Sequence, residues 1–235
     1  MDIQANSDET STLELRKKIK DIDNKEKVNL IIYKVFKRII DIVISIIGII
    51  LLVPLTIVIA IADIFVKDRG PVFYDQERIG KNGKHFKLYK YRSMVKNADD
   101  KLSKYLAENE DARVEYKKYK KLKNDPRVTY IGKIIRKTSI DEFPQFINVF
   151  KGEMSLVGPR PYLEREIEDM GERYNEIIKV KPGLTGLWQV NGRSETTFDD
   201  RTRIDTEYIQ KRSLILDLKI FIRTFLKVFG KEGAK

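Results

Sequence analysis

The chain of 235 residues contains no cysteine and a single histidine, His85. The missing thiols exclude a disulfide scaffold, a zinc ribbon, an iron–sulfur cluster and a cysteine nucleophile. One histidine cannot build a multi-histidine metal site, and a Ser-His-Asp triad would have to use that residue. Any bound metal should therefore be a hard cation held by oxygen atoms, such as Mg²⁺.

Acidic residues are in the minority, with 46 lysines and arginines against 35 aspartates and glutamates, and the net charge is +11. This surplus indicates an anionic partner, which can be a nucleic acid, a phosphorylated substrate or lipid headgroups. Hydrophobic residues make up 42% and charged residues 34% of the chain, which excludes a disordered protein and a protein with many membrane spans.

Formal charge is also missing from residues 42–62, which as a straight helix would measure about 31 Å, close to the thickness of a bilayer core. Pro54 in this run removes a backbone donor and predicts a break. The twenty residues before the run hold five lysines and arginines and the twenty after it hold four, so both ends have the charge of cytoplasmic flanks. We therefore predict a helix–break–helix hairpin that enters one leaflet and returns. A simple kinked span is the alternative.

Beyond this run, aromatic residues in segments 70–80 and 85–94 flank an Asn-Gly pair, which predicts a small β-hairpin. Residues 97–123 predict one helix with a lysine-rich end. That end is either a solvated helix terminus or a contact for anionic headgroups.

Residues 213–229 predict a second amphipathic helix. Lys219, Arg223 and Lys227 recur every four residues and form one basic stripe on an otherwise apolar helix. Such a helix either lies in the membrane interface or belongs to the core with one wet face.

Two adjacent acids, Asp141 and Glu142, stand among basic residues. Ser139 and Glu142 fit the capping box S-x-x-E, so helix capping is one interpretation. Capping explains why one acid stands here but not why there are two. It also does not explain the nearby Arg136 and Arg160. A helix N-terminus lowers carboxylate pKa values, and an ionised Asp141 can attack phosphorus while the second acid holds a metal or moves a proton. Guanidinium groups bind phosphate oxygens in pairs, so both arginines suit a diphosphate.

A glycine-rich segment, Lys181–Arg193, contains Gly183, Gly186 and Gly192, which allow close backbone approach to a ligand. Trp188 in this segment either stacks on a base or anchors the core. The segment matches neither common phosphate-binding glycine motif.

The order of motifs resembles the bacterial sugar transferases, the monotopic polyprenyl-phosphate sugar-1-phosphate transferases, over residues 37–229. Two positions depart from the family pattern, because Ile140 and Phe143 stand where leucine is commoner. The motifs that carry the resemblance are KRIID (37–41), GPVF (70–73), QERIG (76–80), KLYKYRSM (87–94), NDPRVT (124–129), RKTSIDEFPQ (136–145), KGEMSLVGPRP (151–161), KPGLTG (181–186), QVNGR (189–193) and DLK (217–219).

The resemblance implies transfer of sugar-1-phosphate from a UDP-sugar to undecaprenyl phosphate, with release of UMP, as the first membrane step of exopolysaccharide, capsule or glycan synthesis. It implies that Asp141 is the nucleophile of a covalent phosphosugar intermediate. It further implies that Mg²⁺ is required and held at Asp141 and Glu142, and that Arg136 and Arg160 bind phosphates. Further substrate contacts are expected at Arg92, Gln189 and Arg193.

The fold implied is α+β and mostly helical, a monotopic membrane protein with a re-entrant helix broken at Pro54, interfacial amphipathic helices and a small β-hairpin. We divide the chain into a polar lead (1–36), the re-entrant helix (37–67) and a cytoplasmic catalytic domain (68–235). Larger relatives carry a multi-span N-terminal module, so we expect the short catalytic form. We expect the bacterial inner membrane as location, with the catalytic domain on its cytoplasmic face, and a homodimer as a possible assembly.

Three other functions compete with this interpretation. A non-catalytic membrane adaptor would explain the charge and the apolar run but not two acids beside two arginines. A nucleic-acid binder would show steep salt dependence, and the apolar run argues against it. A hydrolase of nucleotide sugars would need no lipid.

Overall fold

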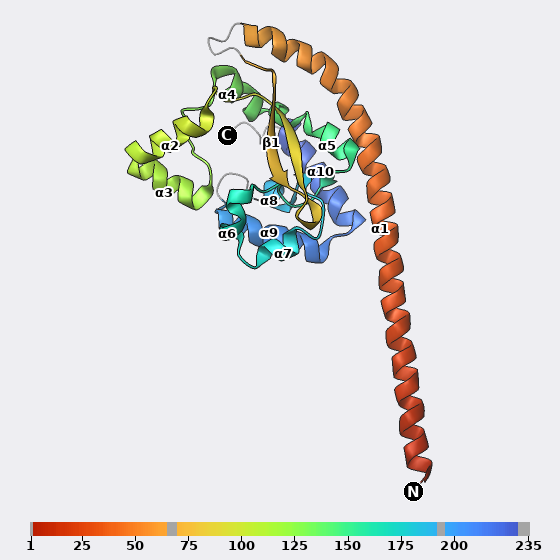
Figure 1. The fold of residues 1–235 in the computed structure, drawn as a ribbon. Coiled ribbons are helices and arrows are strands. Elements are labelled where there is room, and N and C mark those ends of the chain that lie inside the picture. Colours follow the sequence, from red (N-terminus) through yellow and green to blue (C-terminus); the bar gives the residue numbers. More distant parts are fainter. Residues whose placement is uncertain (1, 65–69, 192–195, 230–235) are drawn as a thin grey trace. The chain divides into compact units, whose positions relative to one another are not determined.

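The computed structural model describes residues 2–64, 70–191 and 196–229, and the chain forms two compact units, Met1–Ile40 and Asp41–Lys235. The first unit is the beginning of helix α1 (Asp2–Ile64), which continues into the second (Figure 1). Within α1, the stretch Glu26–Ile64 is long and apolar enough to cross a membrane, and only 22% of its most apolar window is buried. A core helix of a soluble protein would bury far more of its apolar surface.

Pro54 lies inside α1 and does not end it, so the break predicted there is absent. The helix bends along its apolar half instead (Figure 1). The Thr56 hydroxyl donates to the Leu52 carbonyl at 2.7 Å and lies 2.6 Å from the Tyr91 hydroxyl. A threonine hydroxyl that bonds the carbonyl four residues earlier is a local contact that often accompanies a helix bend. Leu52 and Ile59, one on each side of the proline, belong to one apolar cluster with Tyr91, which holds both arms in place.

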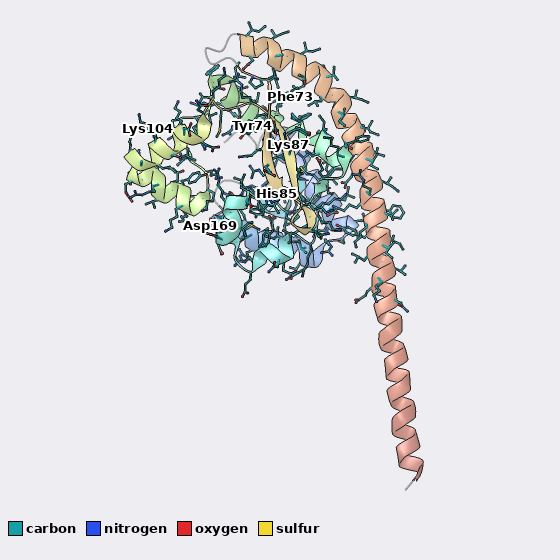
Figure 2. The ribbon with its side chains drawn as sticks, in the orientation of Figure 1. Phe73, Tyr74, His85, Lys87, Lys104 and Asp169 are labelled. Carbon is teal, nitrogen blue, oxygen red and sulfur yellow. The ribbon has the colours of Figure 1, made fainter. Side chains whose placement is uncertain are left out.

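Strands β1 (Phe73–Ile79) and β2 (His85–Tyr91) form the predicted antiparallel hairpin and pair along their full length. Asn82 in the turn has φ 59°, a left-handed conformation that asparagine tolerates. His85 lies 3.1 Å from Glu77 on the exposed face of the hairpin (Figure 2). The single histidine is therefore a surface residue.

A second sheet was not predicted from the sequence. Strands β3 (Ser155–Val157) and β4 (Gly183–Thr185) pair in parallel, and each has only three residues, too few to show a periodic pattern. A Cβ on Gly183 would lie 2.1 Å from the amide nitrogen of Gly158, so this close approach requires glycine. The main core surrounds this sheet. The helices that follow α1 are α2 (Ala98–Glu108), α3 (Glu110–Tyr119), α4 (Tyr130–Lys137), α5 (Gln145–Lys151), α6 (Ile167–Met170), α7 (Arg173–Ile177), α8 (Leu187–Asn191), α9 (Phe198–Lys211) and α10 (Leu214–Phe229), with 3-10 turns at Lys81–Gly83, Ile140–Glu142 and Glu164–Glu166.

The single helix predicted over residues 97–123 is wrong, because two helices, α2 and α3, occupy that segment. Asn109 separates them in an extended conformation, and its side chain accepts a hydrogen bond from the Ala112 amide. Asparagine offers the backbone this alternative to a continuing helix. The two helices form their own small apolar cluster and project to one side of the domain (Figure 1).

Helix α10 confirms the helix predicted over residues 213–229. Asp217 and Ile220 are buried, whereas Lys219 and Arg223 are exposed. The outer face also carries large apolar side chains that are 48–69% exposed: Ile215, Leu218, Ile222, Phe225 and Leu226. An apolar face left open beside a basic stripe favours the interfacial interpretation.

Candidate active site

Asp141 and Glu142 lie on the short 3-10 turn after α4. Ser139 before this turn has φ 57° and makes no side-chain cap, so the predicted capping box does not form. Asp141 is buried, and the Glu142 carboxylate lies 3.3 Å from the Lys90 ammonium of β2. The two acids thus occupy different surroundings, as the separate roles predicted for them require.

The pKa of Asp141 is raised to about 6, whereas the sequence analysis predicted a lowered pKa. Burial is the largest cause and the charge of Glu142 the second, and the cations Lys90 and Arg136 oppose them only in part. A turn of three residues supplies little helix dipole, so burial decides the direction. Asp141 is still mostly ionised at neutral pH, and its burial favours a reactive carboxylate over a hydrated one.

The two acids line a cleft of about 510 Å³. Besides them, four predicted or suspected site residues contribute to its wall: Arg136, Arg160, Trp188 and Gln189. Five further cations, which were not predicted as site residues, also line the cleft: Arg78, Lys90, Lys120, Lys121 and Arg201. The cleft is therefore lined mainly by cations, with Asp141 and Glu142 as its two acids.

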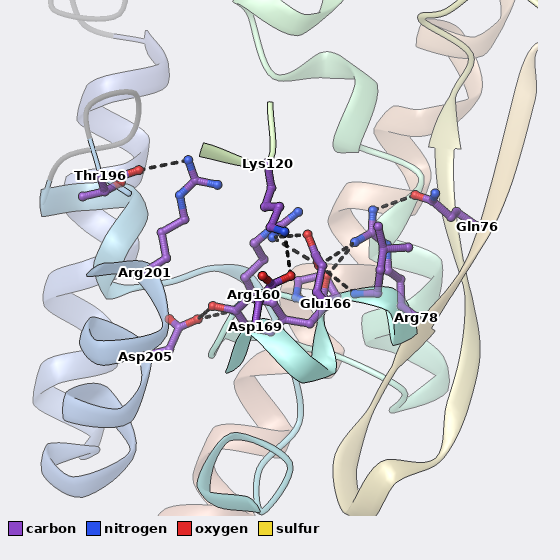
Figure 3. A network of polar contacts seen from close by, with 12 residues as sticks. Gln76, Arg78, Lys120, Arg160, Glu166, Asp169, Thr196, Arg201 and Asp205 are labelled. Atoms are coloured by element: carbon purple, nitrogen blue, oxygen red, sulfur yellow. Dashed lines mark hydrogen bonds and ion pairs between the residues drawn. The ribbon is translucent and has the colours of Figure 1, made fainter. Parts of the chain in front are cut away.

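Arg160 contacts two buried acids, Glu166 and Asp205 (Figure 3). Its guanidinium lies 3.2 Å from the Glu166 carboxylate, and its backbone amide donates to Asp205 at 3.0 Å. Arg78 lies 4.0 Å from the same Glu166 and donates to Gln76. This network fixes two guanidinium groups before any ligand arrives, which lowers the cost of ordering them on binding.

Arg136 reaches the cleft from the last turn of α4. Its Nε donates to the Ser93 hydroxyl at 2.9 Å, and Arg136 lines the same cleft as the acid pair. Arg136 is also one of the two cations whose charge lowers the pKa of Asp141. The sequence prediction that Arg136 lies beside the acid pair agrees with this geometry.

Several of the cations that line the cleft lie close to one another. The pKa of Lys121 falls to about 8 because the ammonium is partly buried and lies near Arg201 and Arg160. Burial and the charge of Arg160 lower the pKa of Arg78 to about 10. The sequence predicted that the lysine-rich helix end contacts solvent or lipid headgroups. Instead, Lys120 and Lys121, at the centre of this run, contribute to the wall of the cleft. Repulsion among these cations is relieved when a polyanion binds.

Three predicted residues lie elsewhere. Arg92 forms an ion pair with Asp63 of α1 at 2.7 Å and does not line the cleft. Arg193 lies outside the described residues. Pro54 lies in α1, as described above.

A second, apolar hollow of about 260 Å³ lies between α1, α5 and α10, and we call it the apolar groove. Its wall includes Ile47 and Leu51 of α1, Phe146 of α5 and Phe225 of α10. Four residues line both the groove and the cleft, so the two spaces adjoin: Ser139, Glu142, Leu184 and Gln189.

The acid pair is the one place in the cleft suited to a cation. Among the described residues, no cluster of three or more carboxylates or histidines could hold a metal ion. Mg²⁺ is commonly bound through one or two carboxylates together with substrate phosphates. Asp141 and Glu142 therefore fit Mg²⁺ when a diphosphate supplies the remaining oxygens.

Comparison with known proteins identifies the family. The family described as "Bacterial sugar transferase" matches residues 32–231. The "Undecaprenyl-phosphate galactose phosphotransferase" of Salmonella typhimurium is 44% identical over 84% of this chain and 41% of that protein. The "Exopolysaccharide production protein ExoY" of Rhizobium meliloti is 41% identical over 84% of this chain and 87% of that protein. The "Galactosyl transferase CpsE" of Streptococcus agalactiae is 43% identical over 85% of this chain and 43% of that protein.

The chain thus spans less than half the length of the Salmonella and Streptococcus relatives and most of the length of ExoY. The matched region contains the acid pair, the cationic cleft and the apolar groove. The motif order in the sequence, the geometry of the cleft and the family match agree, and the chain belongs to the bacterial sugar transferase family.

Proposed function

We propose that this chain transfers sugar-1-phosphate from a UDP-sugar to undecaprenyl phosphate and releases UMP. One observation carries the proposal: the acid pair lies where a cationic cleft meets an apolar groove. The cleft carries positive charge, which suits a nucleoside diphosphate. The groove is apolar, which suits an isoprenoid chain. The names of the relatives, which include an undecaprenyl-phosphate galactose phosphotransferase, support the same pair of substrates.

The reaction proceeds in two displacements at one phosphorus. A carboxylate oxygen of Asp141 attacks the phosphorus that carries the sugar, and the bond from that phosphorus to the bridging oxygen breaks. UMP leaves with the bridging oxygen and its electron pair. An oxygen of the lipid phosphate then attacks the same phosphorus and displaces the Asp141 carboxylate, which completes the lipid diphosphate sugar. Covalent catalysis of this kind divides one difficult transfer into two easier ones.

The basic residues stabilise the charge that moves during these steps. Arg136 lies beside Asp141 and suits the phosphate under attack. Arg160 and Lys121 line the same cleft near one another and suit the phosphate that leaves as UMP. Fixed cations aimed at developing charge lower the barrier without reorganising during the reaction. Mg²⁺, when bound at Asp141 and Glu142, neutralises charge on the phosphate oxygens.

The lipid phosphate reaches the acid pair from the apolar groove. Its isoprenoid chain would lie against α1, α5 and α10, and its phosphate would meet Glu142 and Ser139, which line both spaces. Each buried methylene contributes about 0.8 kcal/mol to binding. Binding of the chain therefore brings a headgroup phosphate to the nucleophile without removing the lipid from its leaflet.

The membrane arrangement proposed is re-entrant, with the catalytic domain on the cytoplasmic face. The basic residues on both flanks of the apolar run, the bend of α1 and the open apolar face of α10 support it. Epitope tags at the two ends of the chain, exposed to protease in spheroplasts, test it. We expect both tags to be protected until the membrane is opened. Cleavage of the N-terminal tag alone in intact spheroplasts would establish a simple span.

The function is tested by UMP release from a panel of UDP-sugars. The full chain is solubilised in detergent with Mg²⁺ and assayed with undecaprenyl phosphate, with a short-chain alkyl phosphate or with no acceptor. We expect release with one or a few sugars, dependent on undecaprenyl phosphate, slower with the short chain and abolished by EDTA. Release without any acceptor would indicate a hydrolase. No release with any sugar, together with vesicle binding, would indicate a membrane adaptor.

A further inference from the structure

Two adjacent residues that follow β2, Arg92 and Ser93, bind side chains from two distant elements of the fold. Arg92 was predicted to contact substrate, but its guanidinium donates to both carboxylate oxygens of Asp63, at 2.7 and 2.8 Å. Its Nε donates to the Pro71 carbonyl at 3.1 Å. The Arg92 and Asp63 side chains are only 9% and 19% exposed, so this ion pair is shielded from solvent and fixes the end of α1 to the end of β2.

A glycine provides the space that this ion pair needs. A Cβ on Gly70 would lie 3.2 Å from the guanidinium carbon of Arg92, so a larger residue would crowd the ion pair. Gly70 and Pro71 begin the motif GPVF, and Arg92 belongs to the motif KLYKYRSM. The two motifs therefore share a role in attaching α1 to the domain, which the proposed chemistry does not include.

The next residue, Ser93, contacts helix α4 at two places. Its carbonyl accepts the Thr129 amide at 3.1 Å, and a Cβ on Gly132 would lie 1.9 Å from the same carbonyl oxygen. Its hydroxyl accepts a hydrogen bond from the Arg136 Nε at 2.9 Å. Because Gly132 and Arg136 are four residues apart, they lie on one face of α4, and both ends of this face contact the buried Ser93.

Arg136 is the cation that we assign to the phosphate under attack, and it lines the cleft with the acid pair. A rigid peptide bond joins Arg92 to Ser93, so a shift of the end of α1 would be passed to the residue that holds Arg136. Building on the transferase activity proposed above, we propose that Arg92 and Ser93 are positioning residues, which hold the Arg136 guanidinium in the cleft and tie its position to the end of α1.

The expected effect of this positioning is on turnover more than on substrate binding. A hydrogen bond at Nε fixes the direction of a planar guanidinium, and a displacement of about 1 Å near the reacting atoms can lower a rate about 10²-fold. Several other cations also line the cleft, so the UDP-sugar would still bind when Arg136 is displaced. Loss of the Ser93 hydroxyl or of the Asp63 charge should therefore lower kcat and leave KM nearly unchanged.

A double-mutant cycle tests the inference through lipid-dependent UMP release by the solubilised full-length protein. We expect Ser93→Ala and Asp63→Asn each to lower kcat about tenfold or more and to change KM for the UDP-sugar less than about twofold. In an Arg136→Ala background, each change should lower the rate less than about twofold further, because the guanidinium that it positions is gone. Single-turnover assays with radiolabelled UDP-sugar measure the slow rates of that background.

Two control variants make the same substitutions at exposed positions of α2. Ser103 donates to the Asp99 carbonyl within its own helix, and the Asp99 carboxylate belongs to an exposed ion pair. Ser103→Ala and Asp99→Asn should keep the wild-type kcat, since neither side chain contacts Arg136 or the residues that hold it.

The cycle separates positioning from folding. Wild-type kcat in Ser93→Ala, or equal losses from Ser93→Ala with and without Arg136, would overturn the positioning role. A loss from Asp63→Asn that persists without Arg136 would overturn the tie to α1, because it would show that the ion pair with Arg92 serves stability alone. No UMP release by the wild type would overturn the proposed function itself.

Discussion

Replacing Asp141 with asparagine is expected to lower lipid-dependent UMP release by about 10⁴-fold or more, because the variant has no oxygen nucleophile to form the covalent intermediate. Asparagine keeps the shape of the side chain and removes a charge whose burial is unfavourable, so the variant should fold. The measurement is steady-state UMP release together with trapping of radiolabelled sugar phosphate on the protein. We expect no label on the Asp141→Asn variant.

Glu142→Gln is the informative companion variant. It keeps the nucleophile, so slow formation of the labelled intermediate should persist while overall turnover falls. The pH profile of the wild type supplies an independent check. Because the pKa of Asp141 is about 6, activity should fall as the pH falls through 6, where the carboxylate becomes protonated. Turnover by Asp141→Asn near the wild-type rate would eliminate the nucleophile assignment.

Replacing Arg160 with alanine should have the second largest effect, a fall in kcat/KM for the UDP-sugar of about 10²–10³-fold, as for other groups that stabilise developing charge. The guanidinium is preorganised by Glu166, and Arg160 lines the same cleft as the acid pair. Glu166 would keep its bonds to the Leu163 amide and its proximity to Arg78, so the loop should remain folded. The rate is measured in the same assay over a range of UDP-sugar concentrations.

Arg165→Ala is the matched control, since it removes an equal charge five residues away. Arg165 is exposed, pairs with Asp99 at 3.7 Å and does not line the cleft. Its activity should stay near that of the wild type. Arg160→Lys should recover only part of the loss, because a lysine cannot make the paired hydrogen bonds of a guanidinium. Equal effects of the two alanine variants would show that general charge, and not the position of Arg160, determines the rate.

Several elements could be predicted because their causes are local. The Asn-Gly turn predicts the β1–β2 hairpin, and the basic stripe of α10 follows from a spacing of four residues. The misjudged elements depend on competition between local and distant contacts. Asn109 ends α2 and caps α3 through its own side chain, while the packing of Leu52 and Ile59 with Tyr91 holds α1 on both sides of Pro54.

The candidate site shows the same division. The acid pair and the two arginines for which we propose phosphate binding, Arg136 and Arg160, are recognisable because their motifs are contiguous in the sequence. Lys121 and Arg201 have no local pattern that separates them from other surface cations, and they reach the cleft from segments eighty residues apart. The raised pKa of Asp141 could not be predicted from the sequence either, because it depends on burial of the carboxyl group by the surrounding fold.

The sequence by itself determined the family, the position of an acid pair among basic residues and the presence of a long apolar helix, because each is encoded by residue types in a contiguous run. Only the tertiary structure decided which cations line the cleft with the acids, that the apolar groove adjoins the cleft, and that Trp188 Nε1, Gln189 Oε1 and Arg201 Nε are buried without hydrogen-bond partners. Desolvation and hydrogen-bond satisfaction depend on every atom packed around a group. Those atoms come from distant parts of the chain, and no local pattern specifies them.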